Sequence, residues 1–273
     1  MAIAELPLPI ARYHAPRRSR RAWSRAGLGL LLPAALLAFW AVGTAYRLFP
    51  PQVLPPPSLV WDSAVDTFRS GKLLSYAAIS FYRVVVGFVI GAGVGLVLGV
   101  AMGLSRTVDD YVRPLFTAIA QVPNLGWIPL LVLLLGIGET LKLTIIAKAA
   151  FIPMVLNTAD GIRRVSPQLL EVARSFRFSN SQLLRLVVLP AAVPSIFTGF
   201  RYGLAKAWTA LVAVELLAAS EGLGYLLVWG RQMFWMDLVI FAIIIIGVIG
   251  FAMDFCLTRA ETYLQRWRTE PEQ

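Results

Sequence analysis

The sequence predicts an all-α polytopic membrane protein with about six transmembrane helices. Of its 273 residues, 58% are hydrophobic and only 15% are charged, and the mean hydropathy is +0.71. Soluble domains carry about 25% charged residues, so this composition excludes a soluble domain. The apolar residues also fall into runs long enough to cross a bilayer, which makes membrane helices the expected elements.

Several segments have the length that a transmembrane helix requires, roughly 20 apolar residues at a rise of about 1.5 Å each. They are 27–46, 81–104, 115–135, 141–160, 191–219 and 238–258. Arginines before the first segment are typical of a signal peptide, but its full length favours a retained helix. The chain thus divides into a basic tail, a first helix, an outer loop, a transmembrane core and a second tail: 1–26, 27–46, 47–80, 81–258 and 259–273.

The outer loop 47–80 begins with a proline-rich stretch. Proline fixes φ and donates no backbone hydrogen bond, so these residues should hold the chain extended. Ser58 can then cap a short helix on which Trp61, Val65 and Phe68 share one face. We expect this helix to rest on the outer membrane interface.

Glycines recur every four residues along segment 81–104, at Gly87, Gly91, Gly95, Gly99 and Gly103. Small residues at this spacing let two helices approach closely in lipid, where hydrophobicity alone does not drive helices together. The pattern favours a tight crossing within this chain over a contact between two copies of it.

The distribution of Lys and Arg sets the orientation, because the cytoplasmic segments of membrane proteins carry the excess of these residues. With the N-terminus inside, the outer segments hold Arg47, Arg69, Lys72, Lys142 and Arg231. The inner segments hold the clustered arginines, namely Arg12, Arg17, Arg18, Arg20, Arg21, Arg25, Arg106, Arg113, Arg163, Arg164, Arg174, Arg177, Arg185, Arg259, Arg266 and Arg268. We therefore expect both termini and the loop 161–190 to be cytoplasmic.

Composition and motifs also exclude several classes of function. The net charge of +10 could indicate nucleic acid, but positive charges placed between apolar runs follow membrane topology, so no nucleic-acid partner is expected. The single Cys256 excludes an internal disulfide and a cysteine metal cluster. Gly71-Lys72 lacks the earlier glycine of a phosphate-binding loop, and His14 is the only histidine. We expect no catalytic residue, no metal site and no cofactor bound by this chain.

The loop 161–190 has the pattern of two short amphipathic helices. Ser166-Pro167 predicts the start of the first, and Ser179 with Gln182 fits a capping box at the start of the second. The apolar side of the first helix would comprise Leu169, Leu170, Val172, Ala173 and Phe176. The flanking arginines leave two interpretations open, a docking element for a partner protein and a hairpin held to anionic lipid.

Glu171, Ala173 and the closing Leu189-Pro190 resemble the cytoplasmic signature of permease subunits of ABC importers. More widely, residues 75–258 are similar to permeases for aliphatic sulfonates, taurine, nitrate and similar small molecules, through the segments VPNLGWIPLLVLLLGIGE, LPAAVPSIFTGFRYGLAKAW and LLAASEGLGYL. In that family the loop is a coupling helix that docks on an ATPase subunit, which favours docking over lipid binding. The implied ATPase-coupling residues are Glu171, Ala173, Arg174, Ser175, Arg177, Leu189 and Pro190.

Arg177 stands where the family signature has a glycine. If the backbone there is left-handed, a non-glycine residue costs about 1 kcal/mol. We expect either that Asn180 takes over the bend or that the two helices join at a different angle.

The resemblance implies a permease in the bacterial inner membrane that passes a small anionic solute, sulfonate-, taurine- or nitrate-like. The implied partners are ABC ATPase subunits that bind the ATP, a periplasmic or extracellular solute-binding protein, a second copy of the chain and membrane lipid. An ion-coupled secondary transporter is the alternative, since charged residues within apolar segments could carry ion coupling. An intramembrane enzyme is more remote, because the chain lacks H-E-x-x-H, G-x-S-x-G and a carboxylate pair within one segment.

Charged side chains within apolar segments cost roughly 2.5 to 3.5 kcal/mol at the membrane centre, so they are functional candidates. A structural pair between Glu215 and either Lys148 or Lys206 is slightly favoured over a lysine that faces a water-filled path. Arg83 and Arg201 lie nearer to segment ends, where snorkelling is the cheaper explanation.

Segment 115–135 carries polar residues beside two prolines, Pro123 and Pro129, which predicts a kinked stretch of the kind that lines cavities. Trp208 and Thr209 could face the same space. The candidate translocation path therefore comprises Gln121, Asn124, Lys148, Lys206, Trp208 and Glu215.

Overall fold

The computed structural model describes residues 21–264, and all regular secondary structure in that range is helical. The chain forms two compact units, residues 1–57 and 58–273. In the first unit, α1 (Arg21–Ala45) is followed by an irregular stretch whose proline-rich part folds back, since Trp40 Nε1 donates to the Pro55 carbonyl oxygen at 2.9 Å.

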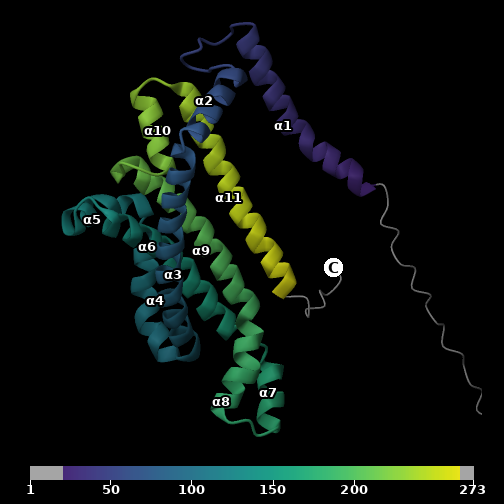
Figure 1. Ribbon diagram of the computed structural model, residues 1–273. Helices are drawn as coiled ribbons and strands as arrows, with labels where there is room; N and C mark the ends of the chain where they lie inside the picture. The colour runs from purple at the N-terminus through teal and green to yellow at the C-terminus, as the bar shows by residue number, and fades with distance from the viewer. Residues whose placement is uncertain (1–20, 265–273) are drawn as a thin grey trace, which may run out of the picture. The chain divides into compact units, whose positions relative to one another are not determined.

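The second unit contains the remaining helices. In chain order they are α2 (Pro57–Arg69), α3 (Lys72–Leu104), α4 (Arg106–Gln121), the 3-10 turn η1 (Asn124–Trp127), α5 (Ile128–Leu135), α6 (Glu139–Arg163), α7 (Pro167–Ser175), α8 (Asn180–Leu183), the π-helical turn η2 (Leu184–Val188), α9 (Leu189–Ala218), α10 (Leu223–Gln232) and α11 (Met236–Leu264). Helices α3, α6 and α9 pack side by side. Figure 1 shows α2 and α10 at one end of this unit and α7 and α8 at the other.

Among the described residues, three helical stretches are long and apolar enough to cross a membrane, namely α3, the run from Asn180 to Gln232, and α11. Helix α4 with the η1–α5 stretch would make a fourth, bent by 94°. All the segments expected to span are largely helical, but the expected count of about six spans is not reproduced. The kink in 115–135 is confirmed as a break, because Val122 precedes Pro123 and adopts an extended conformation with ψ 119°.

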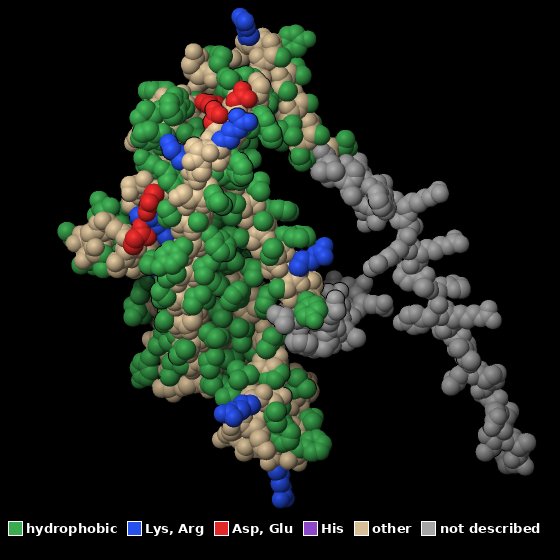
Figure 2. All heavy atoms as spheres, viewed as in Figure 1, with side chains coloured by type: hydrophobic (Ala, Val, Ile, Leu, Met, Phe, Trp, Pro, Cys, Tyr) green, Lys and Arg blue, Asp and Glu red, His purple; other side chains and the backbone are tan. Residues whose placement is uncertain are grey.

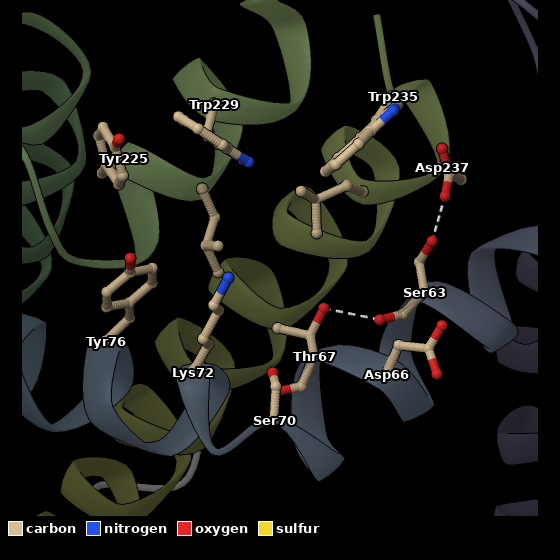
Figure 3. Close-up of a pocket in the computed structure, with 12 residues that line it drawn as sticks. Ser63, Asp66, Thr67, Ser70, Lys72, Tyr76, Tyr225, Trp229, Trp235 and Asp237 are labelled. Atoms are coloured by element: carbon tan, nitrogen blue, oxygen red, sulfur yellow. Dashed lines mark hydrogen bonds between the residues drawn. The ribbon is translucent and has the colours of Figure 1, made fainter. Parts of the chain in front are cut away.

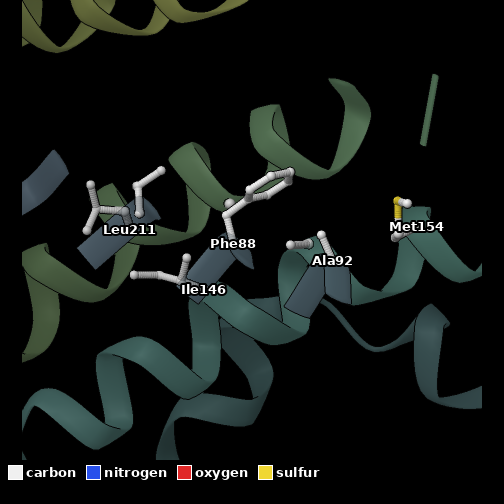
Figure 4. Packing of buried hydrophobic residues seen from close by; sticks show 8 residues of the cluster. Phe88, Ala92, Ile146, Met154 and Leu211 are labelled. Carbon is white, nitrogen blue, oxygen red and sulfur yellow. The ribbon is translucent and has the colours of Figure 1, made fainter. Parts of the chain in front are cut away.

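The glycine pattern of α3 meets α6, which confirms the crossing within the chain. A Cβ added to Gly91 would lie 2.0 Å from the Ala147 carbonyl oxygen, and one added to Gly99 would lie 2.7 Å from Thr158 Cβ. Any larger residue at these positions would push the two helices apart. Alongside these glycines, α3, α6 and α9 contribute a buried cluster, seen in Figure 4, that comprises Val84, Phe88, Ala92, Ile146, Ala150, Met154, Ala207 and Leu211.

The outer surface of the second unit remains apolar. Side chains such as Val89, Val97 and Phe251 are more than half exposed, and hydrophobic side chains cover most of the visible face along α3 in Figure 2. Such a surface fits hydrocarbon rather than water, as the composition predicts.

Helix α2 begins at Pro57, so the expected N-cap role of Ser58 is wrong and Ser58 lies within the first turn. Proline is well suited to that first position because it has no N–H to leave unsatisfied. Trp61 and Phe68 of the expected apolar face are exposed, whereas Val60 and Thr67 are buried. Because apolar side chains of α2 face outward, we still expect this helix to contact the membrane interface.

Candidate functional site

The α7–α8 segment, residues 166–188, starts as the sequence predicts. Ser166 occupies the N-cap position and Pro167 the first position of α7, but the Ser166 hydroxyl bonds to the Gln168 side chain rather than capping the helix. The predicted capping box is confirmed: Ser179 Oγ accepts from the Gln182 amide at 3.3 Å, and Gln182 Oε1 accepts from the Ser179 amide at 2.9 Å.

Arg177 forms the bend between the two helices, with a left-handed φ of 55°. Its amide donates to the Arg174 carbonyl at 2.8 Å, and the Phe178 amide donates to the Ala173 carbonyl at 3.2 Å. This pair of bonds is the Schellman motif, in which glycine usually takes the left-handed position. The expectation that Asn180 takes over the bend is wrong, because Asn180 is already the first residue of α8.

Helix α7 has one packed side and one open side. Ala173 is 3% exposed, so only a small residue fits there, and Leu170 packs on the core cluster of Ile162, Val165, Val188 and Ala192. By contrast, Leu169, Val172 and Phe176 are 49%, 55% and 72% exposed. Their spacing of three and four residues places them on one stripe. Of the coupling candidates, Glu171, Arg174, Ser175, Arg177 and Pro190 are exposed.

The segment continues into α9 without a loop. The π-helical turn Leu184–Val188 leads directly to Leu189, and Pro190 lies in the first turn of α9, where the run is already helical. The second half of the α7–α8 segment and α9 therefore form one continuous helical run.

A cavity of about 550 Å³ lies between the α4–η1 connection, α6 and α9. Asn124, Lys206 and Thr209 line it. Lys148 Nζ donates to Asn124 Oδ1 at 3.0 Å and lies 5.0 Å from the centre of the Trp127 ring. Two of the candidate path residues, Asn124 and Lys206, thus line one cavity, whereas Lys148 lines a different pocket and reaches this cavity through its bond to Asn124.

The remaining candidates lie elsewhere. Gln121 is exposed at the end of α4 and does not line this cavity. Trp208 packs among hydrophobic side chains of α3, α9, α10 and α11, so it faces away from Thr209. Glu215 is fully buried within the packed helices.

Glu215 pairs with Arg83, so the expected pairing with Lys148 or Lys206 is wrong. Arg83 Nη1 lies 2.8 Å from Glu215 Oε1. Ser80 Oγ donates to the same carboxylate, and the Gly224 amide donates to it at 2.9 Å. A buried carboxylate needs this many partners because burial removes its hydration.

Arg83 also bonds to Glu139 through Nε and Nη2, at 2.9 and 2.6 Å, and to the Glu221 carbonyl oxygen at 2.8 Å. It is fully buried, so the expectation that it snorkels is wrong. The sequence did carry a signal: Arg83 precedes Gly87 by four residues and therefore lies on the same stripe that meets α6. Arg201 is 39% exposed and pairs with Asp254, which the sequence analysis did not foresee.

The model of binding-protein-dependent transport system inner membrane components matches residues 87–268. The chain belongs to this family. Family membership makes the chain a transport subunit of the inner membrane rather than an enzyme.

Relatives of the same family align over most of their length. A Bacillus subtilis (strain 168) permease named for aliphatic sulfonates transport, SsuC, is 38% identical over 94% of this chain and 92% of its own. The Escherichia coli (strain K12) taurine transport system permease protein TauC is 34% identical, over 87% and 88% of the two chains. The bicarbonate transport system permease protein CmpB of Synechococcus elongatus is 30% identical, over 90% and 91%.

Chains from solved structures of ABC transporters share the fold. An amino acid ABC transporter crystal structure superposes with a TM-score of 0.59 at 18% identity, covering 75% of this chain and 98% of the other. The MetNI methionine ABC transporter, in an inward-facing conformation, gives 0.52 at 20% identity, covering 71% and 94%. At these identities the likeness concerns the fold alone.

Proposed function

We propose that the chain is the permease subunit of an ATP-binding cassette importer, and that the α7–α8 segment couples it to a separate ATPase subunit. The observation that carries this proposal is the open apolar stripe of α7, Leu169, Val172 and Phe176, at the tip of a rod that continues into α9. Exposed apolar side chains flanked by Glu171 and Arg174 suit a protein groove better than water.

The proposed solute is small and anionic, of the sulfonate, taurine or nitrate type. The relatives are named for aliphatic sulfonates, taurine and bicarbonate, which all carry an anionic oxygen group. Lys148 and Lys206 make no ion pair with a carboxylate among the described residues; Lys206 lines the cavity, and Lys148 bonds to Asn124, which also lines it. A desolvated cation without a counter-charge favours an anion beside it.

The complete importer would contain two ATPase subunits that bind the ATP, an external solute-binding protein and a second copy of this chain. The chain itself would bind no cofactor and no nucleic acid, and both of its termini would lie in the cytoplasm. Its exposed apolar surface would contact lipid and the second copy.

Uptake by reconstituted vesicles tests this function. With the ATPase subunit and binding protein present, ATP should drive accumulation of a small sulfonate, and removal of ATP should abolish it. An ion-coupled secondary transporter, the alternative function, would instead accumulate solute under an ion gradient without either partner.

The first prediction concerns Glu171→Lys. Reversal of this exposed charge beside the apolar stripe should prevent docking of the ATPase and abolish uptake while the protein still inserts in the membrane. Co-purification of the ATPase measures docking. Asp110→Lys, an exposed reversal on α4, is the matched control and should bind the ATPase normally. Undiminished complex formation and uptake in Glu171→Lys would remove the docking role from α7.

A further inference from the structure

A second cavity, of about 500 Å³, lies between α2, α3, α10 and the start of α11. It shares no lining residue with the cavity of Asn124 and Lys206. Its helices gather at the end of the unit opposite to the α7–α8 segment (Figure 1). Charged and aromatic side chains from four elements converge on it, as Figure 3 shows.

The α2 wall of this cavity presents hydrogen-bond acceptors. Thr67 Oγ1 donates to the Ser63 carbonyl at 2.7 Å, and Ser70 Oγ donates to the Thr67 carbonyl at 3.0 Å. Ser63 Oγ donates to Asp237, a bond drawn in Figure 3. With their protons committed, these hydroxyl oxygens offer lone pairs. Asp66 adds an exposed carboxylate whose side chain has no hydrogen bond or ion pair within residues 31–263.

The α3–α10 wall presents hydrogen-bond donors. Lys72 extends toward the middle of the group in Figure 3, and Tyr76, Tyr225 and Trp229 stand beside it. Tyr225 lies 6.1 Å from both Tyr76 and Trp229, centre to centre, so the three rings form one aromatic wall. The ammonium of Lys72 and the polar hydrogens of the three rings have no hydrogen-bond acceptor in the described part of the chain.

Lys72 and Asp66 line one cavity yet form no ion pair with each other. Aromatic residues also gather at membrane interfaces without binding any ligand. An interface belt alone does not explain why hydrogen-bond acceptors on one wall face hydrogen-bond donors on the other. A ligand that carries both charges would satisfy both walls at once, because each end gains charge-assisted hydrogen bonds.

We propose that this cavity binds a small zwitterion, with its ammonium group toward Asp66 and the α2 hydroxyls and its anionic oxygen group toward Lys72. The aromatic wall covers the short carbon chain between the two ends. The role of this site, receipt of the solute before passage, rests on the proposed function, whereas the binding itself does not.

Calorimetric titration of the full chain in lipid nanodiscs tests the site, with 2-aminoethanesulfonate, ethanesulfonate and ethylammonium as probes. The zwitterion should bind saturably, and each single-charge probe should bind at least about tenfold more weakly. Equal affinity for ethanesulfonate, or no saturable binding of the zwitterion, would overturn the inference.

Matched variants locate the binding. Asp66→Asn and Lys72→Met should each weaken zwitterion binding about tenfold, and Lys72→Arg should restore most of it. Asp62→Asn and Arg69→Met remove exposed charges of the same region that do not line the cavity, so affinity should persist. Unchanged affinity in Asp66→Asn and Lys72→Met places the binding elsewhere and refutes this site.

The vesicle assay separates this inference from the proposed function. If the chain drives ATP-dependent uptake but does not bind the zwitterion here, the inference alone fails. If the zwitterion binds here but no ATP-dependent uptake occurs, the proposed function fails and the site stands.

Discussion

At the scale of single residues, one guanidinium group joins four stretches of chain. Arg83 on α3 contacts Glu139 at the start of α6, Glu215 on α9 and Glu221 in the turn before α10. Each of these contacts is a charge-assisted bond to a group that is costly to leave unpaired. Arg83 therefore fixes the relative positions of helices whose apolar surfaces alone would allow sliding.

Removal of Arg83 should destabilise the protein more than removal of an exposed arginine. Arg83→Met leaves Glu215 buried without its cation, which costs about 3–5 kcal/mol. Thermal unfolding in nanodiscs measures the loss, with Arg231→Met at an exposed position as the control. The double variant Arg83→Met/Glu215→Gln should recover part of the stability, because the stranded charge is gone. An unfolding temperature of Arg83→Met equal to that of the control would contradict this role.

Lys206, which lines the cavity beside Asn124, and Lys148, which bonds to Asn124, should affect transport rather than stability. Glu215 is already paired with Arg83, so neither Lys148→Met nor Lys206→Met strands a buried carboxylate. Each variant should assemble normally and import an anionic solute at least about tenfold more slowly, as expected for a lost charge interaction. Uptake in vesicles decides it, with Arg231→Met as the control. Parental uptake by both lysine variants would show that neither side chain serves the path.

At the scale of elements, the bend after α7 is closed by the backbone rather than by a special residue. The two Schellman bonds form although arginine, not glycine, takes the left-handed position. Helix α7 tolerates a strain of roughly 1 kcal/mol because its buried side packs on Val165 and Val188. The bend is thus closed despite the departure from the family signature.

Arg177→Gly should relieve this strain and slow the hydrogen exchange of the Phe178 amide by about fivefold, which corresponds to about 1 kcal/mol. Arg174→Gly is the matched control with the opposite sign, because a glycine inside α7 destabilises the helix. Faster exchange in Arg177→Gly would mean that the arginine side chain itself stabilises the bend.

At the scale of the whole molecule, orientation is the property to test. Ser58, Ser179 and Ser220 are all exposed, so cysteines placed there differ in membrane side rather than in burial. In a Cys256→Ser background, an impermeant thiol reagent added outside should label the cysteines at 58 and 220 and spare the one at 179. External labelling at 179 would reverse the orientation and remove the α7–α8 segment from the cytoplasm.

Helix positions, the glycine crossing, the break near Pro123 and the capping box were predictable because each depends on local or periodic sequence features. The Arg83 network was not, because it joins residues that are 56 and 132 positions apart. Apolar periodicity shows that a charged residue lies within a helical segment, but it does not identify the residue with which that charge forms an ion pair. Lys148 shows the same limit, since its contact with Asn124 depends on a 94° bend. The prolines predict that a bend exists but not the direction in which the chain turns.

The π-helical turn Leu184–Val188 sets the angular phase between the docking segment and α9. A π turn holds about one residue more than an α turn, and one residue corresponds to about 100° of rotation around a helix axis. If the same residues were wound as a regular α-helix, the stripe of Leu169, Val172 and Phe176 would swing around α9 by about that angle. The side of the molecule that an ATPase would have to approach therefore depends on the π winding of this one turn.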